Sequence, residues 1–249
     1  MIVTENQPDG TPTWIDLGIP DLDRAMEFYG ALFGWQFEPG PAEFGRYTMA
    51  YAGGRRVAGL APTDATAYWW NVYLATTDCD AAAAAVQTAG GSVIDPPIDM
   101  LDQGRMAIVH DAAGGQFGLW QGRAHVGCEL VNEPNSLVRN DLVTDQPELA
   151  RRFYAAVFGF TLDRNPDLPD LDFTFLRRSD GHEVGGIFGM ASAAGTRWST
   201  TFEVDDTDAA VRRAVAAGGR AGEVDEMIYG RFAEITDPFG VEFSVIARP

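Results

Sequence analysis

The sequence predicts an α+β protein of four similar units, each a strand, a helix and three further strands, arranged as two tandem domains. Two observations support this prediction: long segments recur about 125 residues apart, and each copy alternates strand-like stretches with single amphipathic helices. The first recurring segment is DRAMEFYGALFGW (23–35), which returns as ELARRFYAAVFGF (148–160). Phe28-Tyr29 thereby corresponds to Phe153-Tyr154, and Phe33-Gly34 corresponds to Phe158-Gly159.

A second pair of segments shows that the repeat spans most of the chain. DCDAAAAAVQTAGG (78–91) returns as DTDAAVRRAVAAGG (206–219), and Gly104-Arg105 returns as Gly230-Arg231. Asp111 likewise corresponds to Asp237. The halves are therefore duplicates, and we expect domains at 10–124 and 134–249 with GCELVNEPNS (127–136) as the linker.

The first unit begins with the strand-like TWIDLGI, after which Asp21 is a plausible helix N-cap. Apolar residues then follow at helical spacing, and Gly34 suits the left-handed position that closes a helix. The stretches RYTMAYA and RRVAGLA complete the unit as strands around the turn Gly53-Gly54.

The other three units follow the same order. The second has NVYLATT, a helix over 79–89, and the strands GSVID, GRMAIVH and QFGLWQG. The third begins at LVRNDLV, with Asp145 and Glu148 as the expected capping pair of its helix. The fourth runs from STTFEV to VEFSVIA. Two such units side by side would form a curved sheet around a shared cleft, where a ligand would bind.

Composition limits the partners. The net charge of −18 argues against nucleic acid and against anionic membrane surfaces, because both are bound through clustered Lys and Arg. No apolar run is long enough to span a membrane, and the N-terminus does not resemble a signal peptide, so we expect a cytoplasmic protein. Cys79 and Cys128 form no CxxC pair and indicate neither a disulfide framework nor a zinc site.

The segments PDLDRAMEFYGALFGW, GRMAIVHDAAGGQFGLW and GRFAEITDPFGVEFSV resemble the vicinal oxygen chelate superfamily. This superfamily includes glyoxalase I, bleomycin- and fosfomycin-resistance proteins and extradiol dioxygenases. The two-half arrangement is similar to that of glyoxalase-like actinobacterial proteins, some of them associated with aromatic polyketide antibiotic pathways. The resemblance implies four βαβββ units in two domains, with a divalent metal bound by His and Glu on the first and last strands of the units.

This chain departs from that metal-binding pattern. The resemblance places the first-strand positions at Trp14, Asn71, Val138 and Ser199, and the last-strand positions at Ala58 or Gly59, Gly118, Gly185 and Ser244. None of them is His, Asp or Glu, the side chains that usually bind such a metal. Glu183 stands near one position but is alone, and no histidine lies on a first strand. The sequence therefore predicts no metal and no other cofactor.

Strand alternation predicts which side chains face the clefts. For the first cleft they are Trp14, Asp16, Asn71, Tyr73, Gly118 and Trp120; for the second they are Val138, Asn140, Ser199, Thr201, Ser244 and Ile246. Aromatic walls with a few polar groups suit a planar or apolar ligand, and Gly118 would leave a space. Core packing explains Trp14 and Trp120 equally well.

Three functions remain open from the sequence. The first is a metal-independent protein that binds a small aromatic or hydrophobic metabolite, for sequestration or for natural-product biosynthesis. The second is an enzyme, either metal-free with Asp16 as a base whose pKa is raised by burial, or with atypical metal ligands. The third is a structural or regulatory role. Arg105 and Arg231 are expected to form structural ion pairs, and a homodimer is possible.

Overall fold

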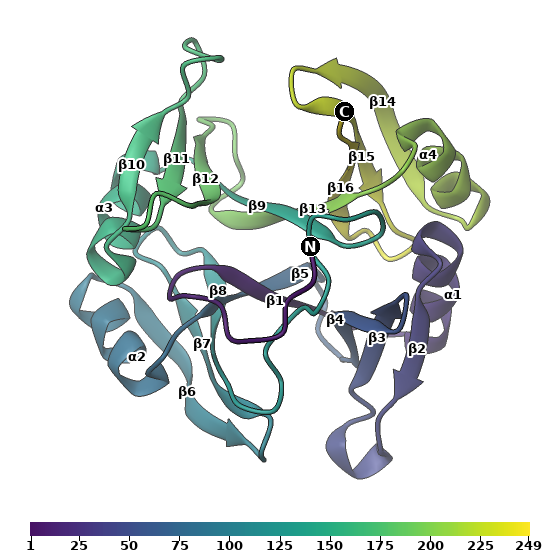
Figure 1. Ribbon diagram of the computed structural model, residues 1–249, viewed down its shortest axis with the longest axis horizontal. Helices are drawn as coiled ribbons and strands as arrows, with labels where there is room; N and C mark the ends of the chain where they lie inside the picture. Colours follow the sequence, from purple (N-terminus) through teal and green to yellow (C-terminus); the bar gives the residue numbers. More distant parts are fainter.

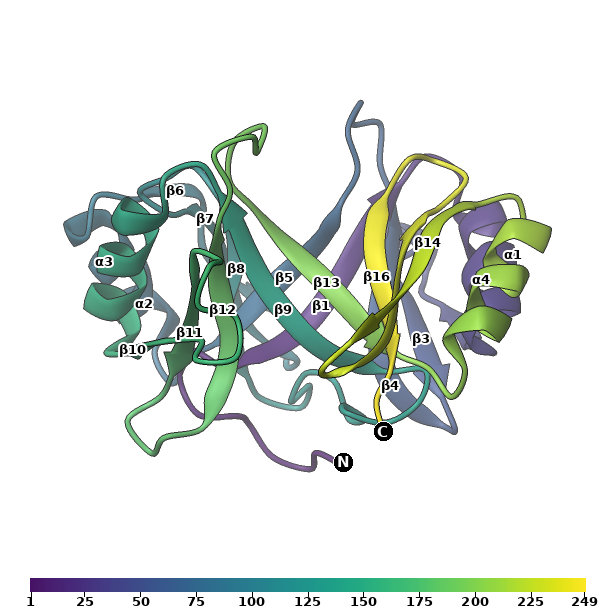
Figure 2. The same ribbon diagram turned by 90° about the horizontal axis from the view of Figure 1, so that it is seen from above.

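The computed structural model describes residues 1–249, apart from the side chain of Phe44, and contains two eight-stranded mixed sheets (Figures 1 and 2). The first half contains β1 (Pro12–Ile19), α1 (Leu22–Phe33), β2 (Gln36–Pro39), η1 (Ala42–Phe44), β3 (Thr48–Ala52), β4 (Arg55–Pro62), β5 (Trp70–Ala75), α2 (Cys79–Thr88), β6 (Ser92–Met100), β7 (Gly104–His110) and β8 (Gln116–Gly122). The second half contains β9 (Leu137–Thr144), α3 (Pro147–Phe158), β10 (Thr161–Arg164), β11 (Phe173–Arg177), β12 (Glu183–Gly189), β13 (Arg197–Glu203), α4 (Thr207–Ala216), β14 (Arg220–Met227), β15 (Gly230–Thr236) and β16 (Glu242–Ala247).

Each sheet combines the two units of one half. The strand order is β2-β3-β4-β1-β5-β8-β7-β6 in the first half and β10-β11-β12-β9-β13-β16-β15-β14 in the second. The first strands of the two units, β1 and β5 or β9 and β13, pair antiparallel at the centre, and the last strand of each unit pairs parallel to its first strand. The predicted α+β fold of four units, two to each curved sheet, is confirmed.

The helices lie on the outside of the molecule and bring the halves together. In Figure 1, α2 and α3 lie side by side at the left, and α1 and α4 at the right, so each helix pair joins opposite halves. We call the face of each sheet that is turned away from the helices its inner face. The opposite, outer face carries the fully buried side chains Ile15 and Leu17 of β1, as expected for a sheet with one packed face.

Two helix termini follow the sequence prediction and one does not. Asp21 caps α1 by accepting from the backbone N–H of Arg24, and Gly34 ends this helix in the left-handed conformation. The expected cap at Asp145 is wrong, because α3 begins one residue later, with Gln146 as N-cap and Pro147 in its first turn. Proline fixes φ near the helical value and lacks an N–H, so it favours the first helical position.

Paired hydrogen bonds connect the halves through the repeated turns. Tyr29 on α1 donates from its hydroxyl to Asp237 Oδ2 at 3.1 Å, and Tyr154 on α3 donates to Asp111 Oδ2 at 2.9 Å. Asp111 Oδ1 also accepts from the N–H groups of Ala113 and Gly115, which closes its own turn. Among the described helices, none combines the length and apolar content needed to cross a membrane.

Candidate functional site

Asp16 occupies the centre of the first inner face. It pairs with Gly59 of β4 on one side and with Asn71 of β5 on the other. Three side chains donate to its carboxylate: Asn71 Nδ2 at 2.9 Å, Tyr73 OH at 3.0 Å and Tyr47 OH at 3.1 Å. Gln116 Nε2 in turn donates to Asn71 Oδ1 at 3.2 Å, which fixes the orientation of that amide. The result is a preorganised acceptor held by three donors, one of which is oriented in turn by Gln116.

Two glycines make room for the tyrosine rings of this cluster. A Cβ atom added at Gly59 would overlap the phenol of Tyr47, and one added at Gly118 would overlap the ring of Tyr73. The predicted space over Gly118 is therefore filled by Tyr73, because a flat ring can lie directly on the backbone of a residue that has no side chain. Sequence alternation places residues on a face but does not show which neighbour covers them.

Burial sets the protonation of this cluster. Desolvation raises the pKa of Asp16, although the bonds from Asn71, Tyr73 and Tyr47 favour its charged form and work in the opposite direction. Burial, and next the nearby charge of Asp16, raise the pKa values of Tyr47 and Tyr73 well above the usual value. Both phenols therefore remain protonated donors at neutral pH.

The two predicted tryptophans lie below this cluster rather than on an open wall. Trp14 and Trp120 are 3% and 6% exposed. Trp14 donates from Nε1 to Tyr47 OH at 2.8 Å, and Trp120 donates to the carbonyl of His125 at 2.8 Å. The His125 ring packs edge-on against Trp14, with centroids 4.4 Å apart. These tryptophans support the Asp16 cluster, and their own exposed surface is small.

Apolar side chains surround the polar centre. Met49 pairs with Gly59, Ile108 with Gly118 and Met106 with Trp120, so all three lie on the inner face, where they are half-buried. Ile98 pairs with Met106 at the edge of the sheet and is 56% exposed. Tyr47 and this apolar ring were not among the sequence-predicted site residues. The correspondence of Tyr47-Thr48 with Phe173-Thr174 in the repeat is the sequence feature that could have identified Tyr47 as a site residue.

The second inner face differs from the prediction by one residue on β9. Asn140 pairs with Thr200 and is only 1% exposed, and Leu142 beside it pairs with the buried Trp198, so Asn140 lies on the outer face. The inner face of β9 instead carries Arg139 and Asp141, and Val138 lies at the β-bulge before Arg139, where it has no paired residue on β13. A shift of one residue exchanges the two faces of a strand. Ser199, Thr201 and Ser244 lie on the inner face as predicted.

An ion-pair network occupies that second face. Asp141, the counterpart of Asp16, accepts from Arg139 Nε at 2.7 Å, and Arg139 also donates to Glu183 at 2.7 Å. The Arg139 guanidinium lies 5.5 Å from the ring centre of Phe173. The three donors that hold Asp16 have become Phe173, Ser199 and Thr201, so the duplicated carboxylates have different surroundings.

Comparisons with known proteins agree with this architecture. A family model described as "Glyoxalase-like domain" matches the chain twice, over residues 13–120 and 138–246. This chain belongs to the glyoxalase-like domain family. It is similar to "Putative glyoxylase CFP32" of Mycobacterium tuberculosis, with 40% identity over 95% of this chain and 94% of that protein. It is also similar to "Anthracycline biosynthesis protein DnrV" of Streptomyces peucetius, with 36% identity over 95% and 93%.

Solved structures extend the likeness in fold. The Mn(II)-bound glyoxalase from Novosphingobium aromaticivorans superimposes with a TM-score of 0.69 at 19% identity, over 95% of this chain and 83% of that one. The 2,3-dioxygenase LapB from Pseudomonas sp. KL28 gives 0.66 at 14% identity, over 98% and 95%. Together with the family matches, these neighbours confirm the resemblance to the vicinal oxygen chelate superfamily.

The donor set of this glyoxalase-like protein does not fit a divalent metal. In the first half, Asp16 is already held by three donors and tyrosine rings cover Gly59 and Gly118. In the second half, the Arg139 guanidinium is paired to the carboxylate of Asp141. Within the described part of the chain, no three His, Cys, Asp or Glu side chains are grouped so that they could hold an ion.

The repeated Gly-Arg pairs have the expected structural role. Arg105 Nε lies 2.8 Å from Asp80, and Arg231 Nε lies 2.7 Å from Asp208, each joining a β-strand to the first turn of the helix in the same unit. Equivalent contacts in both halves indicate shared architecture rather than a unique reactive site.

Proposed function

We propose that this glyoxalase-like protein binds a small planar, largely apolar metabolite on its first inner face, without a metal ion. The observation that carries the proposal is the fixed carboxylate of Asp16 at the centre of a half-buried apolar ring. The predicted site residues take two roles here. Asp16, Asn71 and Tyr73 form the polar centre, while Trp14, Gly118 and Trp120 shape its floor.

The chemistry of this face supports such a ligand. Met49, Met106 and Ile108 offer polarisable and aliphatic contacts to a flat molecule. Asp16 is a partly exposed acceptor whose three bonds hold it in one orientation, so a ligand hydroxyl can meet it with little rearrangement. The relative named for anthracycline biosynthesis favours a polycyclic aromatic compound.

Fluorescence titration tests the proposal directly. An anthracycline aglycone should quench tryptophan emission and raise Tm, equally before and after treatment with a chelator. Met106→Glu should weaken this binding at least tenfold, because it places a charge in the apolar ring. Phe232→Glu, at the equivalent position of the second inner face, is the matched control and should leave binding unchanged. Binding that disappears with the chelator, or equal losses in both variants, would contradict the proposal.

A second function is favoured by one specific observation. The carboxyl of Asp16 has a pKa raised by burial and touches two protonated phenols, an arrangement that suits a general base in metal-free isomerisation, cyclisation or hydroxylation. Asp16→Asn keeps the shape of the site but removes the base. It should retain binding and abolish turnover of any bound substrate, with Asp141→Asn as the control. Turnover that survives Asp16→Asn would exclude this mechanism.

A further inference from the structure

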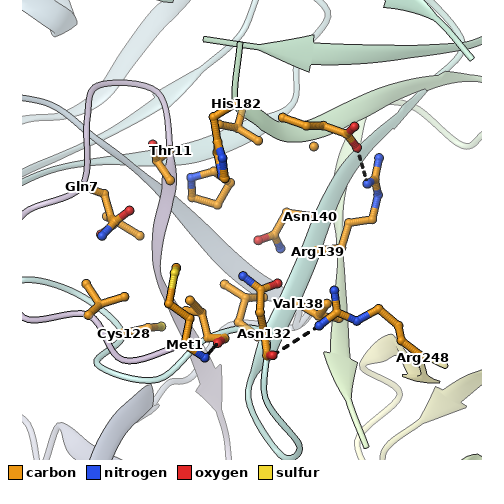
Figure 3. A pocket seen from close by; sticks show the side chains of 18 residues that line it. Met1, Gln7, Thr11, Cys128, Asn132, Val138, Arg139, Asn140, His182 and Arg248 are labelled. Carbon is orange, nitrogen blue, oxygen red and sulfur yellow. Dashed lines mark hydrogen bonds and ion pairs between the residues drawn. The ribbon is translucent and has the colours of Figure 1, made fainter. Parts of the chain in front are cut away.

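Two cavities lie where residues of both halves meet, and they differ in charge. The larger, of about 250 Å³, lies between the N-terminal segment and the strands β9 and β12 (Figure 3). Its charged side chains are already paired: Arg139 donates to Glu183 at 2.7 Å, and Arg248 contacts Glu203. These charges therefore favour neither a cation nor an anion.

The smaller cavity, of about 160 Å³, opens where β13 and β16 separate. These two strands pair in parallel only from Thr201 and Ser244 onward, so their first residues leave a gap. The segment before β5, with Tyr68 and Trp69, belongs to the first half and lines the same cavity. We call this cavity the β13–β16 groove.

The duplicated half shows why the groove stays open. The equivalent strands β5 and β8 also pair only beyond their first residues, but Gln116 Nε2 donates to Asn71 Oδ1 at 3.2 Å and bridges the gap. The corresponding residues of the second half are Glu242 and Ser199. The serine side chain is shorter, and no hydrogen bond joins this pair in the described structure. The groove is therefore particular to the second half.

The groove has an excess of negative charge. Glu234 is exposed on β15, and none of the described side chains forms an ion pair with it. Glu242 contacts Arg197 at 3.5 Å, and both of these side chains are more than half exposed. Two carboxylates against one guanidinium favour a cation. A metal ion is not favoured, because the described residues include no group of three His, Cys, Asp or Glu that could hold one.

The aromatic residues of the groove favour an organic cation. Trp69 is 43% exposed and Tyr68 is half-buried, whereas the next residue, Trp70, belongs to the core. The face of an indole ring attracts positive charge, and methylated ammonium groups are the ligands that aromatic side chains most often bind in this way. An exposed tryptophan beside an unpaired carboxylate therefore offers both attractive forces to such a group.

Ser244 adds a polar group deeper in the groove. This residue is 6% exposed and lines the groove, and its hydroxyl has no hydrogen-bond partner among the described residues. A hydroxyl both donates and accepts, and burying one without a partner costs free energy. A hydroxyl on the ligand could supply that partner. The corresponding residue of the first half is Gly118, which offers no such group.

We propose that the β13–β16 groove is a second binding site, for a small methylated ammonium compound that also carries a hydroxyl group. Trp69 and Glu234 bind the ammonium group, and Ser244 bonds to the hydroxyl. The groove shares no residue with the Asp16 site. Either site can therefore exist without the other, and each can be tested alone.

Ligand-observed NMR with choline and 3,3-dimethyl-1-butanol provides the first test. The two compounds have the same shape, but only choline carries the positive charge. At physiological ionic strength, choline should bind the native protein and the Asp16→Asn variant alike, and at least tenfold more tightly than the neutral compound. Absence of choline binding, or equal binding of both compounds, would overturn the proposal.

Single variants separate the groove from the overall charge of the protein. Glu234→Gln keeps the shape of the groove and should weaken choline binding at least fivefold. Glu223→Gln, on the exposed part of β14, changes the net charge equally and should have no effect. Trp69→Leu keeps apolar bulk without an aromatic face and should also weaken binding at least fivefold. Equal losses for the two glutamate variants, or full binding by Trp69→Leu, would contradict the site.

A double variant closes the groove. Ser199→Asn with Glu242→Gln recreates the Asn71–Gln116 pair of the first half. The new asparagine can also donate to Asp141 Oδ1, which has no partner in the described structure, as Asn71 does to Asp16. This variant should therefore fold with a Tm no lower than that of the native protein, and should lose choline binding at least tenfold. Unchanged choline binding in the folded variant would show that the cation binds elsewhere.

Discussion

At the scale of single residues, the first inner face depends on Gly59 and Gly118, because a side chain at either position would overlap a tyrosine ring. Gly118 lies under the Tyr73 ring, whose hydroxyl holds Asp16. The second half has Ser244 at the position of Gly118, and there Thr201 replaces Tyr73. The same volume is therefore filled either by a side chain of the last strand or by a tyrosine ring from the neighbouring strand.

Gly118→Ala should therefore destabilise the protein by about 2–4 kcal/mol, since the new Cβ forces Tyr73 away from its packed position and from Asp16. Urea unfolding measures the loss. Ser244→Ala, at the equivalent position, should cost much less. The double variant Gly118→Ser with Tyr73→Thr copies the second half and should regain part of the stability. A harmless Gly118→Ala would show that the ring does not need this space.

His125 predicts a pH dependence of stability. Burial, with a smaller contribution from the charge of Arg56, lowers the pKa of this imidazole to about 4, against 6.5 in an unfolded chain. Between these values the unfolded chain binds the proton more readily, so stability falls as pH decreases from about 6.5 to 4. The full loss is about 3 kcal/mol, because each pKa unit corresponds to about 1.4 kcal/mol.

Comparison with His125→Phe isolates this contribution. Burial raises the pKa values of Asp16, Asp111 and Asp237, and these carboxyls therefore take up protons earlier in the folded protein, which changes stability in the opposite direction. They are present in both proteins and largely cancel in the difference. As pH falls from 6.5 to 4.5, the free energy of unfolding of the native protein should decrease relative to that of the variant. Parallel curves would disprove the role of His125.

At the scale of elements, the sequence predicted strands and helices well where apolar residues mark one face. On β1, Ile15, Leu17 and Ile19 alternate with Trp14 and Asp16, and the predicted inner face was correct. On β9 the buried residues include Asn140 and Thr144, which are polar, so the pattern of apolar residues does not show which face of the strand is buried. The one-residue error on this strand therefore arises because the structure buries polar side chains on its outer face.

The same limit applies to what the site contains. Sequence alternation brought Asp16, Asn71 and Tyr73 to one face, and the pairing of β1 with β5 places them together. It did not predict Tyr47, which follows the turn at residues 45–46, directly before β3, and whose ring lies over Gly59. Long side chains reach several ångströms from their own backbone. The alternation of residues along a strand does not predict the direction in which such a side chain extends.

At the scale of the whole molecule, duplication predicted two halves but not how they pack. The apolar face of α1 reaches beyond its own sheet: the Phe33 ring centre lies 4.9 Å from that of Phe202, and Tyr29 lies 5.8 Å from Phe243. Both partners belong to the second half. The halves therefore share one core, and each contributes helices that cover part of the other, as Figure 2 shows from above.

The tyrosine–aspartate pairs across this shared core make unequal contributions. Tyr154 OH donates to Asp111 and also accepts from Trp198 Nε1 at 3.0 Å, whereas the corresponding Trp70 Nε1 finds no partner in the described structure. Tyr154→Phe leaves both an aspartate oxygen and an indole N–H unsatisfied in the interior. Tyr29→Phe removes only the donor to Asp237.

Each buried polar group left without a partner costs about 1–3 kcal/mol, so Tyr154→Phe should destabilise the protein by at least about 1 kcal/mol more than Tyr29→Phe. Urea unfolding at pH 7 compares the two variants. Because the halves share a core, both variants should still unfold in a single transition followed equally by fluorescence and circular dichroism. Equal losses would mean that the indole bond to Tyr154 contributes nothing. Two separate transitions would show that the halves are independently stable and that these bonds only dock them.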